Sequence, residues 1–432
     1  MKKRFIFILC GLFLCAGTIA ATDYNALQQG AVGDGKTLNT KSLQSAIDAL
    51  HAKGGGQLYF PAGRYLTGSL QLKSNVTLYL EKEAMLLGST SPYDYPGFST
   101  EKELKVNNDH FDQALIYAEG AENIGITGEG CIDGQGRELA LTIDSLHHTG
   151  ELVDKHYNTY RKRSNTRPKL LFMRNCRKVE LRKTNFRSGA AWGLSFSLCV
   201  DLTIDSLHVE NRAYWNNDGI DISDCKDVRI SNCFINSADD GICLKSHNRG
   251  AWNDRVSISN CHIISSASAI KFGTESLGGF KNVTIDNIRI KDTFRSAIAI
   301  ESVDGAEIEN VKLENIEIVC PGRATRGMAY MSVSRLKDVP ENEKGYPEFT
   351  MFEELPSWGF YVRHVKGIQM HNVKLRLQED DFRPAFVFDR VSDVRLSGIS
   401  LPENKKEGQV VLRQTNLQSA DDAVKEYITE VE

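Results

Sequence analysis

Two acidic segments near the middle of the chain carry the residue types best suited to catalysis. The first is Asn216-Asn217-Asp218-Gly219, and the second is Ala238-Asp239-Asp240-Gly241. Carboxylic acids placed on either side of a glycosidic bond hydrolyse it, one by donating a proton and another by activating water or attacking directly. The two segments therefore predict a glycosidase, provided that the fold brings the acids together.

A periodic strand pattern indicates that they do meet. Runs such as Leu202-Thr203-Ile204 alternate apolar and polar residues, as a strand with one buried face does. The third residues of successive runs differ by 23, 26, 28, 27 and 23 positions; they are Leu181, Ile204, Ile230, Ile258, Ile285 and Ile308. Such a period marks a solenoid, whose neighbouring coils lie about 4.8 Å apart. The separation of Asp218 and Asp239 along the chain is close to one such period.

Recurrent asparagines refine this interpretation. An asparagine falls two positions after the apolar residue in several runs, at Asn232, Asn260, Asn287, Asn310 and, later, Asn372. Asparagine stacked at a recurrent bend is typical of a parallel β-helix, because its side chain bonds nearby backbone and the next coil. Leucine-rich repeats are excluded, since their consensus and their helical segments are missing. We expect an all-β chain, folded as a right-handed parallel β-helix.

The N-terminal region supplies a cap for the solenoid. Leu43, Ala46, Ile47 and Leu50 follow helical spacing behind Asn39-Thr40, and a run of glycines at 54–56 ends the helix. An exposed solenoid end invites pairing with another chain. The pattern therefore predicts an N-terminal capping helix.

The chain divides into three expected parts. Residues 1–20, with a basic start, a short apolar run and small residues at the end, are typical of an export signal. Residues 21–90 should form the N-terminal cap and first coils, and residues 91–432 the catalytic β-helix, with an insertion at 320–365. Aromatic segments of that insertion, Tyr346-Pro347-Glu348 and Trp358-Gly359-Phe360-Tyr361, are candidates to wall one end of the cleft. We expect an exported monomer, periplasmic or extracellular, without membrane insertion once the signal is removed.

Composition excludes some partners. A net charge of −4 and a pI near 6.2 leave no electrostatic footprint for nucleic acid. No cofactor and no metal site are expected. Eight cysteines remain after the signal, none with CxxC spacing, and they favour stacked free thiols over disulfides.

A family resemblance adds to these observations. Residues 30–35, Gly-Ala-Val-Gly-Asp-Gly, and residues 54–65, Gly-Gly-Gly-Gln-Leu-Tyr-Phe-Pro-Ala-Gly-Arg-Tyr, look like the N-terminal signature of pectin-degrading β-helix enzymes. Together with the acidic segments, the chain resembles the polygalacturonases of glycoside hydrolase family 28. The resemblance implies that Asp239 is the general acid and that Asp218 and Asp240 activate water in an inverting single displacement. It also implies that Asn216 binds and orients the substrate.

The chain departs from that family where a uronate would be bound. The family's Gly-His-Gly falls on Ala267-Ser268-Ala269, so Ser268 replaces the histidine, and its Arg-Ile-Lys falls on Ala299-Ile300-Glu301. Two like charges 4 Å apart repel by about 1 kcal/mol in water and about 4 kcal/mol at an effective dielectric of 20, so Glu301 would oppose a uronate. Either the sugar at the cleaved position is neutral, such as rhamnose or galactose, or another cation replaces the lost pair. The candidate substrate-binding residues are Lys271, Lys245, Arg295, Ser268, His247 and Glu301.

Two alternatives to a glycosidase remain open at this point. A polysaccharide lyase on the same fold would use an arginine or lysine as the base, and a binding β-helix would have lost catalysis along with the missing cations. Trp192 and Tyr214-Trp215 are candidates for a sugar subsite. Three further acids, Asp221, Asp224 and Asp227, are interpreted as turn residues that satisfy backbone donors.

Overall fold

The computed structural model describes residues 22–95, 114–151, 167–302, 304–322, 333–339, 355–402 and 408–432. The expected export signal and Tyr346-Pro347-Glu348 lie outside the described residues. Within the described residues, no helix is long and apolar enough to cross a membrane.

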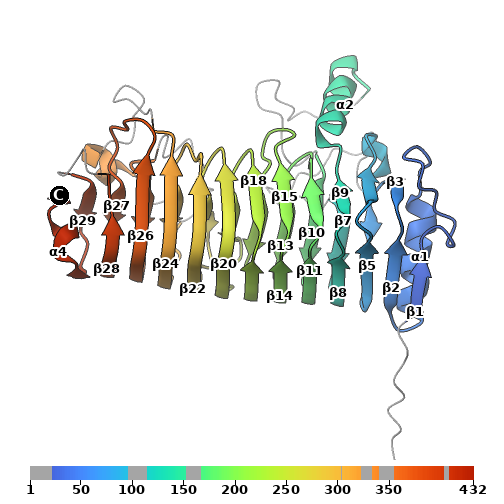
Figure 1. The fold of residues 1–432 in the computed structure, drawn as a ribbon, viewed down its shortest axis with the longest axis horizontal. Coiled ribbons are helices and arrows are strands. Elements are labelled where there is room, and N and C mark those ends of the chain that lie inside the picture. Colours follow the sequence, from blue (N-terminus) through green and yellow to red (C-terminus); the bar gives the residue numbers. More distant parts are fainter. Residues whose placement is uncertain are drawn as a thin grey trace, which may run out of the picture.

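The chain forms a right-handed parallel β-helix whose coils stack along one long axis (Figure 1). Strands of successive coils pair in parallel, in two sheets. Sheet B has twelve strands: β4 (Leu70–Gln71), β7 (Ala114–Glu119), β10 (Lys169–Arg174), β13 (Leu194–Ser197), β16 (Ile220–Ser223), β19 (Ile242–Ser246), β21 (Ile270–Ser276), β23 (Ile298–Glu301), β25 (Phe360–Arg363), β27 (Phe386–Asp389), β29 (Val410–Arg413) and β31 (Ile428–Val431).

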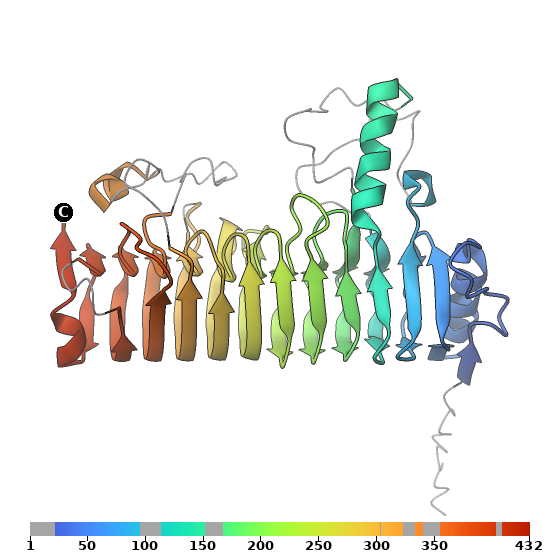
Figure 2. The ribbon, with the colours of Figure 1, turned by 45° about the horizontal axis from the view of Figure 1, so that its top comes forward.

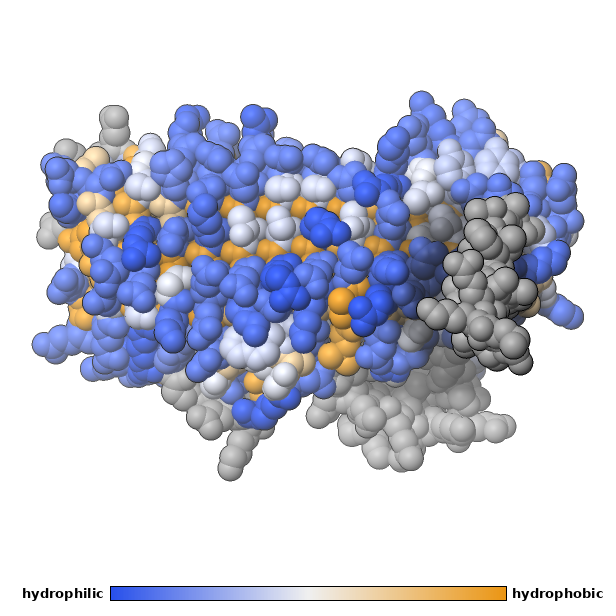
Figure 3. Space-filling model, turned by 90° about the horizontal axis from the view of Figure 1, so that it is seen from below, coloured by the Kyte–Doolittle hydropathy of each residue, from blue (hydrophilic) through white to orange (hydrophobic). Residues whose placement is uncertain are grey.

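Sheet A contains the remaining strands and wraps the other faces of the coil. It comprises β1 (Thr22–Asn25), β2 (Gly56–Phe60), β3 (Gly63–Thr67), β5 (Val76–Leu80), β6 (Ala84–Gly88), β8 (Glu122–Thr127), β9 (Cys131–Asp133), β11 (Arg177–Arg182), β12 (Asn185–Arg187), β14 (Val200–Asp205), β15 (His208–Asn211), β17 (Lys226–Ser231), β18 (Phe234–Ser237), β20 (Asn253–Ser265), β22 (Phe280–Lys291), β24 (Ile308–Cys320), β26 (Val365–Leu377), β28 (Ser392–Ser400) and β30 (Leu417–Ala420). Seen from below, apolar residues form rows that run along the long axis between hydrophilic ones (Figure 3). Each coil thus repeats the side-chain pattern of its neighbour.

The predicted strand register is confirmed for most coils. Leu181 pairs with Ile204, Ile204 with Ile230, Ile230 with Ile258, and Ile258 with Ile285, all in the buried core. The last predicted step is wrong, because Ile285 pairs with Leu313 and not with Ile308. Strand β24 carries two apolar–polar repeats around a bend, so its sequence fits either register until the coils are stacked.

The asparagines form hydrogen-bonded ladders at the bends. The asparagines that the sequence placed in one row belong to two different ladders, for the same reason that the register of Ile308 was wrong. Asn260 donates to Asn232 Oδ1 (3.3 Å) and Asn287 donates to Asn260 Oδ1 (2.8 Å). Asn310 belongs to a different bend, where it donates to Asn282 Oδ1 at 2.7 Å. Asparagine tolerates the positive φ that these bends require, which is 53 to 56° at Asn232, Asn260, Asn282, Asn287 and Asn310.

Helix α1 (Thr40–Ala52) covers the N-terminal end of the coils and buries the four predicted residues. The Asn39 side chain, at the start of this helix, makes no capping hydrogen bond to it. It instead accepts a hydrogen bond from the Val32 N–H (2.7 Å) and donates to the carbonyl of Leu66 (3.2 Å), so it ties the preceding loop to strand β3.

Other helices are peripheral. Helix α2 (Gly136–Thr149) projects from the side of the coils (Figure 2), and the short helices are η1 (Pro92–Asp94), η4 (Val333–Asp338) and α4 (Asp422–Lys425). The eight cysteines, Cys131, Cys176, Cys199, Cys225, Cys233, Cys243, Cys261 and Cys320, are free thiols, as predicted.

Candidate active site

The candidate site lies on the outer face of sheet B. Alternate residues of each strand point outward, and parallel pairing aligns them in a row from coil to coil. One such row runs through Ser195, Asp221, Cys243, Lys271 and Ala299, on strands β13, β16, β19, β21 and β23. The acids of the two motifs sit just before β16 and β19, beside this row.

Stacking places Asp240, and not Asp239, one coil above Asp218. The Gly219 N–H donates to the carbonyl of Asp240 at 2.9 Å, and Ile220 of β16 pairs with Ile242 of β19. The glycine after Asp218 makes this approach possible, because a Cβ on Gly219 would lie 2.5 Å from the Gly241 carbonyl oxygen. Asp239 adjoins the pair and accepts a hydrogen bond from the Asp240 N–H at 3.1 Å.

Two predicted substrate-binding lysines contact these acids. Lys245 Nζ lies 3.7 Å from Asp218 Oδ2 and 3.5 Å from Asp221 Oδ1. Lys271 Nζ lies 3.2 Å from Asp240 Oδ2. The two lysines and the three acids that they contact are all buried. The site is therefore a compact cluster of buried opposite charges.

The cluster shifts the pKa values of its carboxyls in opposite directions. Burial raises the pKa of Asp239, and repulsion from Asp240 raises it further. Burial also disfavours ionisation of Asp240, but Lys271 and Arg295 outweigh it and lower its pKa. Burial, with repulsion from Asp221 and then Asp239, raises the pKa of Asp218. Neighbouring carboxyls whose environments push their pKa values apart are the arrangement that acid–base catalysis requires.

Asp221 was interpreted from the sequence as a turn residue, and that interpretation is wrong. It lies in β16, is fully buried, and both carboxylate oxygens lack a hydrogen bond within the described part of the chain. The alternation of Asp221 with the apolar residues Ile220 and Ile222 is the sequence pattern that could have placed its side chain on the outer face of sheet B. Asp224 is a turn residue, as predicted, and its carboxylate accepts a hydrogen bond from the His247 N–H at 3.1 Å.

Asn216 is held by an arginine that no sequence motif had singled out. Its Oδ1 accepts a hydrogen bond from Arg167 Nη2 at 2.9 Å, and Arg167 Nη1 donates to the Trp215 carbonyl at 2.7 Å. The guanidinium also lies 5.0 Å from the Tyr214 ring centroid. Arg167 thus holds the segment that leads into Asp218. Trp215 is 66% exposed.

The remaining predicted residues flank Asp240. The Ser268 N–H donates to Asp240 Oδ1 at 3.2 Å, while its buried hydroxyl has no partner within the described residues. Arg295 is half-buried; it opposes the rise in the pKa of Asp239 and helps Lys271 to lower the pKa of Asp240. Burial raises the pKa of Glu301 to about 7, although Lys271 opposes the rise.

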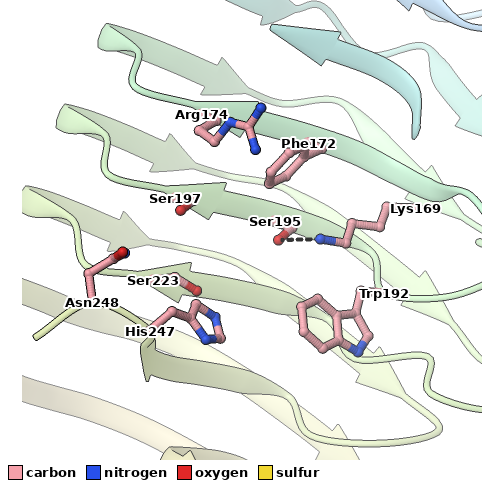
Figure 4. Close-up of a pocket in the computed structure, with 9 residues that line it drawn as sticks. All are labelled: Lys169, Phe172, Arg174, Trp192, Ser195, Ser197, Ser223, His247 and Asn248. Atoms are coloured by element: carbon pink, nitrogen blue, oxygen red, sulfur yellow. Dashed lines mark hydrogen bonds between the residues drawn. The ribbon is translucent and has the colours of Figure 1, made fainter. Parts of the chain in front are cut away.

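On the N-terminal side of the acids, the outer face of sheet B carries a pocket of about 210 Å³ (Figure 4). Only two of the residues that line it were predicted from the sequence as site residues. The two predicted residues are His247, which bonds Glu275 through Nδ1 at 2.6 Å, and Trp192. The pocket is lined by Lys169, Phe172, Arg174, Trp192, Ser195, Ser197, Ser223, His247 and Asn248. The lining residues come from several coils and are far apart in the sequence, so no local sequence motif predicts the pocket.

On the C-terminal side, apolar residues cover the outer face of sheet B. Leu336, Val339 and Leu355, between β24 and β25, form a buried cluster with the outward residues Ala299, Tyr361, Val387 and Val411 of strands β23, β25, β27 and β29. Because Ala299 pairs with Lys271, this cover begins one strand beyond Lys271.

Comparisons with known proteins agree with this geometry. Residues 56–320 match the family Glycosyl hydrolases family 28. A probable polygalacturonase of Vitis vinifera is 30% identical over 299 residues, covering 65% of this chain and 55% of that protein. An exo-poly-alpha-D-galacturonosidase of Dickeya chrysanthemi is 28% identical over 248 residues, covering 50% of this chain and 41% of that protein.

A solved structure shows the same fold. The family 28 exopolygalacturonase of Yersinia enterocolitica superposes with a TM-score of 0.64 at 22% identity, covering 95% of this chain and 77% of that one. The chain belongs to glycosyl hydrolases family 28. It spans about half the length of the curated relatives that it matches, and it resembles the polygalacturonases among them.

Proposed function

We propose that the protein is an exported glycosidase that hydrolyses an O-glycosidic bond in a pectic or related plant polysaccharide or oligosaccharide. The observation that carries the proposal is the cluster of buried Asp218 and Asp240 with half-buried Asp239 at the edge of sheet B. Asp239, whose pKa is raised, protonates the leaving oxygen. Asp240, whose pKa is lowered by Lys271 and Arg295, accepts the proton of the attacking water, and Asp218, whose pKa is raised, assists by holding that water in a single displacement.

A neutral sugar is proposed for the ring beside Lys271. Lys271 is already engaged by Asp240 at 3.2 Å, and the buried Glu301 lies on the neighbouring strand. A uronate here would compete with Asp240 for the lysine and would be repelled by an ionised Glu301. Rhamnose or galactose meets neither obstacle.

Action near a chain end is proposed from the apolar cover. The outer face of sheet B is covered from β23 onward, so a bound glycan that reaches Lys271 has little room to continue in that direction. It can extend in the other direction, along β19, β16, β13 and β10.

The lyase alternative is disfavoured by the state of its base. A lysine base needs a lowered pKa, whereas Asp240 counters the burial of Lys271 and raises the pKa of that ammonium. A lyase would also release an unsaturated product that absorbs ultraviolet light.

The test is a product screen with a matched variant. Purified protein is incubated with rhamnogalacturonan, polygalacturonate and galactan fragments, and the first anomer released is followed by NMR. We expect hydrolysis with inversion, and we expect Asp239→Asn to lower kcat by about 10²- to 10⁴-fold, since it keeps the shape of the acid without its proton. Full activity of this variant would exclude Asp239 as the acid, and absence of any hydrolysis by the wild type would favour the binding β-helix.

A further inference from the structure

Two loops carry the acids to the edge of sheet B, and they differ in length. Asp239 and Asp240 lie in residues 238–241, a short connection between β18 and β19. Asp218 lies in residues 212–219, a connection twice as long between β15 and β16. A longer loop has more backbone that no strand pairing holds. The shape of this loop therefore depends on hydrogen bonds made by side chains.

Two asparagines hold the backbone of the longer loop. Asn217 Nδ2 donates to the carbonyl of Ala191, in the preceding coil, at 2.7 Å. Asn211 Nδ2 donates to the carbonyl of Asp218 at 2.8 Å. Both asparagines are fully buried. The chain that follows Asn216 is therefore fixed in place, and the orientation of the Asn216 side chain depends on its own partner.

That partner is Arg167, which lies two coils away, just before β10. Arg167 Nη2 donates to Asn216 Oδ1 at 2.9 Å. Its Nη1 donates to the carbonyl of Trp215 at 2.7 Å and to the carbonyl of Ala190. Arg167 is only 1% exposed. Burial lowers the pKa of Arg167 to about 10, so the guanidinium stays charged at neutral pH.

Helix α2 supports the guanidinium from the side of the coils (Figure 2). The Tyr214 ring centroid lies 5.0 Å from the guanidinium carbon of Arg167. The Tyr214 hydroxyl donates to Asp144 Oδ2 at 3.1 Å, and Asp144 is a buried residue of α2. These contacts connect a helix outside the coils with the loop that carries Asp218.

The contact with Arg167 decides which end of the Asn216 amide is available to a ligand. An arginine side chain has only donors, so the amide atom that faces it must be the oxygen. The Nδ2 group then points away from the guanidinium, and it has no hydrogen-bond partner among the described residues. Asn216 is half-buried, so a ligand can reach it. The group that remains for a ligand is therefore a hydrogen-bond donor.

We propose that Arg167 is a positioning residue that holds the Asn216 amide with its Nδ2 donor toward the bound glycan, and that Tyr214 and Asp144 keep Arg167 in place. The inference rests on the proposed function and deepens it, because it specifies what Asn216 recognises. The recognised group is an acceptor oxygen of a sugar, such as a hydroxyl or ring oxygen. The charged guanidinium on the amide oxygen polarises the amide and strengthens this donor.

Steady-state kinetics of Arg167→Lys test this role. A lysine keeps a cation near the two carbonyls, but it has no planar fork to reach Asn216 Oδ1 as well. For whichever of the rhamnogalacturonan, polygalacturonate or galactan fragments is hydrolysed, we expect KM to rise about three- to tenfold, the contribution of one hydrogen bond. We expect kcat to change less than about twofold, because the lost contact contributes to binding alone. A fall in kcat at constant KM, as loss of folded enzyme would cause, contradicts the inference.

Two further variants test whether the effect passes through Asn216. In the Asn216→Ala background, Arg167→Lys should raise KM no further, because its partner is already absent. Additive effects would mean that Arg167 acts elsewhere. The matched control is Arg212→Lys, since Arg212 Nη1 donates to Asn236 Oδ1 at 3.0 Å and to the Ser237 carbonyl in a similar contact on β18. An equal rise in KM for this control would overturn the specific role of Arg167.

Calorimetric titration separates this inference from the proposed function. The fragments are titrated into Asp239→Asn, and adding Arg167→Lys to that variant should weaken binding by a factor similar to the rise in KM. Binding that depends on Arg167, without hydrolysis by the wild type, would support the inference and overturn the proposed function. Hydrolysis with a KM that does not depend on Arg167 would do the reverse. Failure of every fragment to bind would overturn both.

Discussion

The outer face of sheet B carries two buried rows of charged side chains, and the carboxyls are paired differently in each row. Toward the C-terminus, Arg363 and Arg413 each donate to one oxygen of Asp389, at 2.9 and 2.8 Å, and all three side chains are buried. Around β16 to β21, the lysines Lys245 and Lys271 lie against several carboxyls at 3.2 to 3.7 Å.

The difference indicates a structural role for the C-terminal row and a catalytic role for the acid cluster. The C-terminal row pairs both oxygens of one carboxylate with two guanidinium groups at hydrogen-bond distance, which is the geometry of a structural ion pair. The acid cluster places more carboxyls than lysines in a confined space, so its members have shifted and unequal pKa values. Perturbed carboxyls of this kind gather at functional sites.

Breaking the C-terminal row should produce the largest effect on stability. Asp389→Asn removes the carboxylate charge to which two buried guanidinium groups donate, and we expect a loss of about 3 to 5 kcal/mol in the free energy of unfolding. Urea unfolding followed by circular dichroism measures it. The control is Asp227→Asn, which removes a pair with Arg255 at the surface and should cost far less, because solvent screens that pair. Equal effects of the two substitutions would show that the buried row has no special structural role.

Breaking the acid cluster should instead change the pH dependence of activity. Lys271→Met removes the cation that keeps the pKa of Asp240 low, so the acidic limb of kcat/KM should move to higher pH. We expect a loss of roughly tenfold near pH 5 that shrinks toward pH 8, because an adjacent opposite charge shifts carboxyl pKa values on this scale. A pH–rate profile measures it, with Lys281→Met, at a lysine outside the acid cluster, as control. A loss of equal size at every pH would mean that Lys271 acts on substrate binding alone.

Glu301 lies between the two rows and should change stability only in a pH-dependent way. Its pKa is raised by burial from 4.5 to about 7 in the folded chain. The folded state therefore holds a proton that the unfolded state releases, and this stabilisation is complete below pH 4.5 and is lost as the pH rises to 7. Glu301→Gln should remove that loss, which is at most about 1.4 kcal/mol per pH unit.

Thermal unfolding of both proteins at pH 5 and pH 8 measures this difference. The variant should gain stability relative to the wild type at pH 8 and not at pH 5. A gain at both values would indicate removal of repulsion that does not depend on the proton.

The capping helix and most of the strand register could be predicted from the sequence. Alternation decides which face of each strand is buried, and helical spacing decides the face of α1, because both follow from local backbone geometry. The two acidic motifs could be found in the same way, since each is contiguous. Ile308 was misassigned because β24 contains two equivalent repeats, and only pairing with β22 selects Leu313.

Tertiary structure alone decided how the acids and cations meet. Coils differ in length, so counting residues placed Asp239 above Asp218, whereas the hydrogen bonds between coils place Asp240 there. The pocket around Lys169 and Trp192 draws on several coils, and its charge balance depends on which side chains those coils bring together. Local sequence determined the buried faces and the acidic segments of this protein. Burial and stacking across coils determined which of those acids has a raised pKa and which a lowered one, because a pKa depends on neighbours that are distant in the chain.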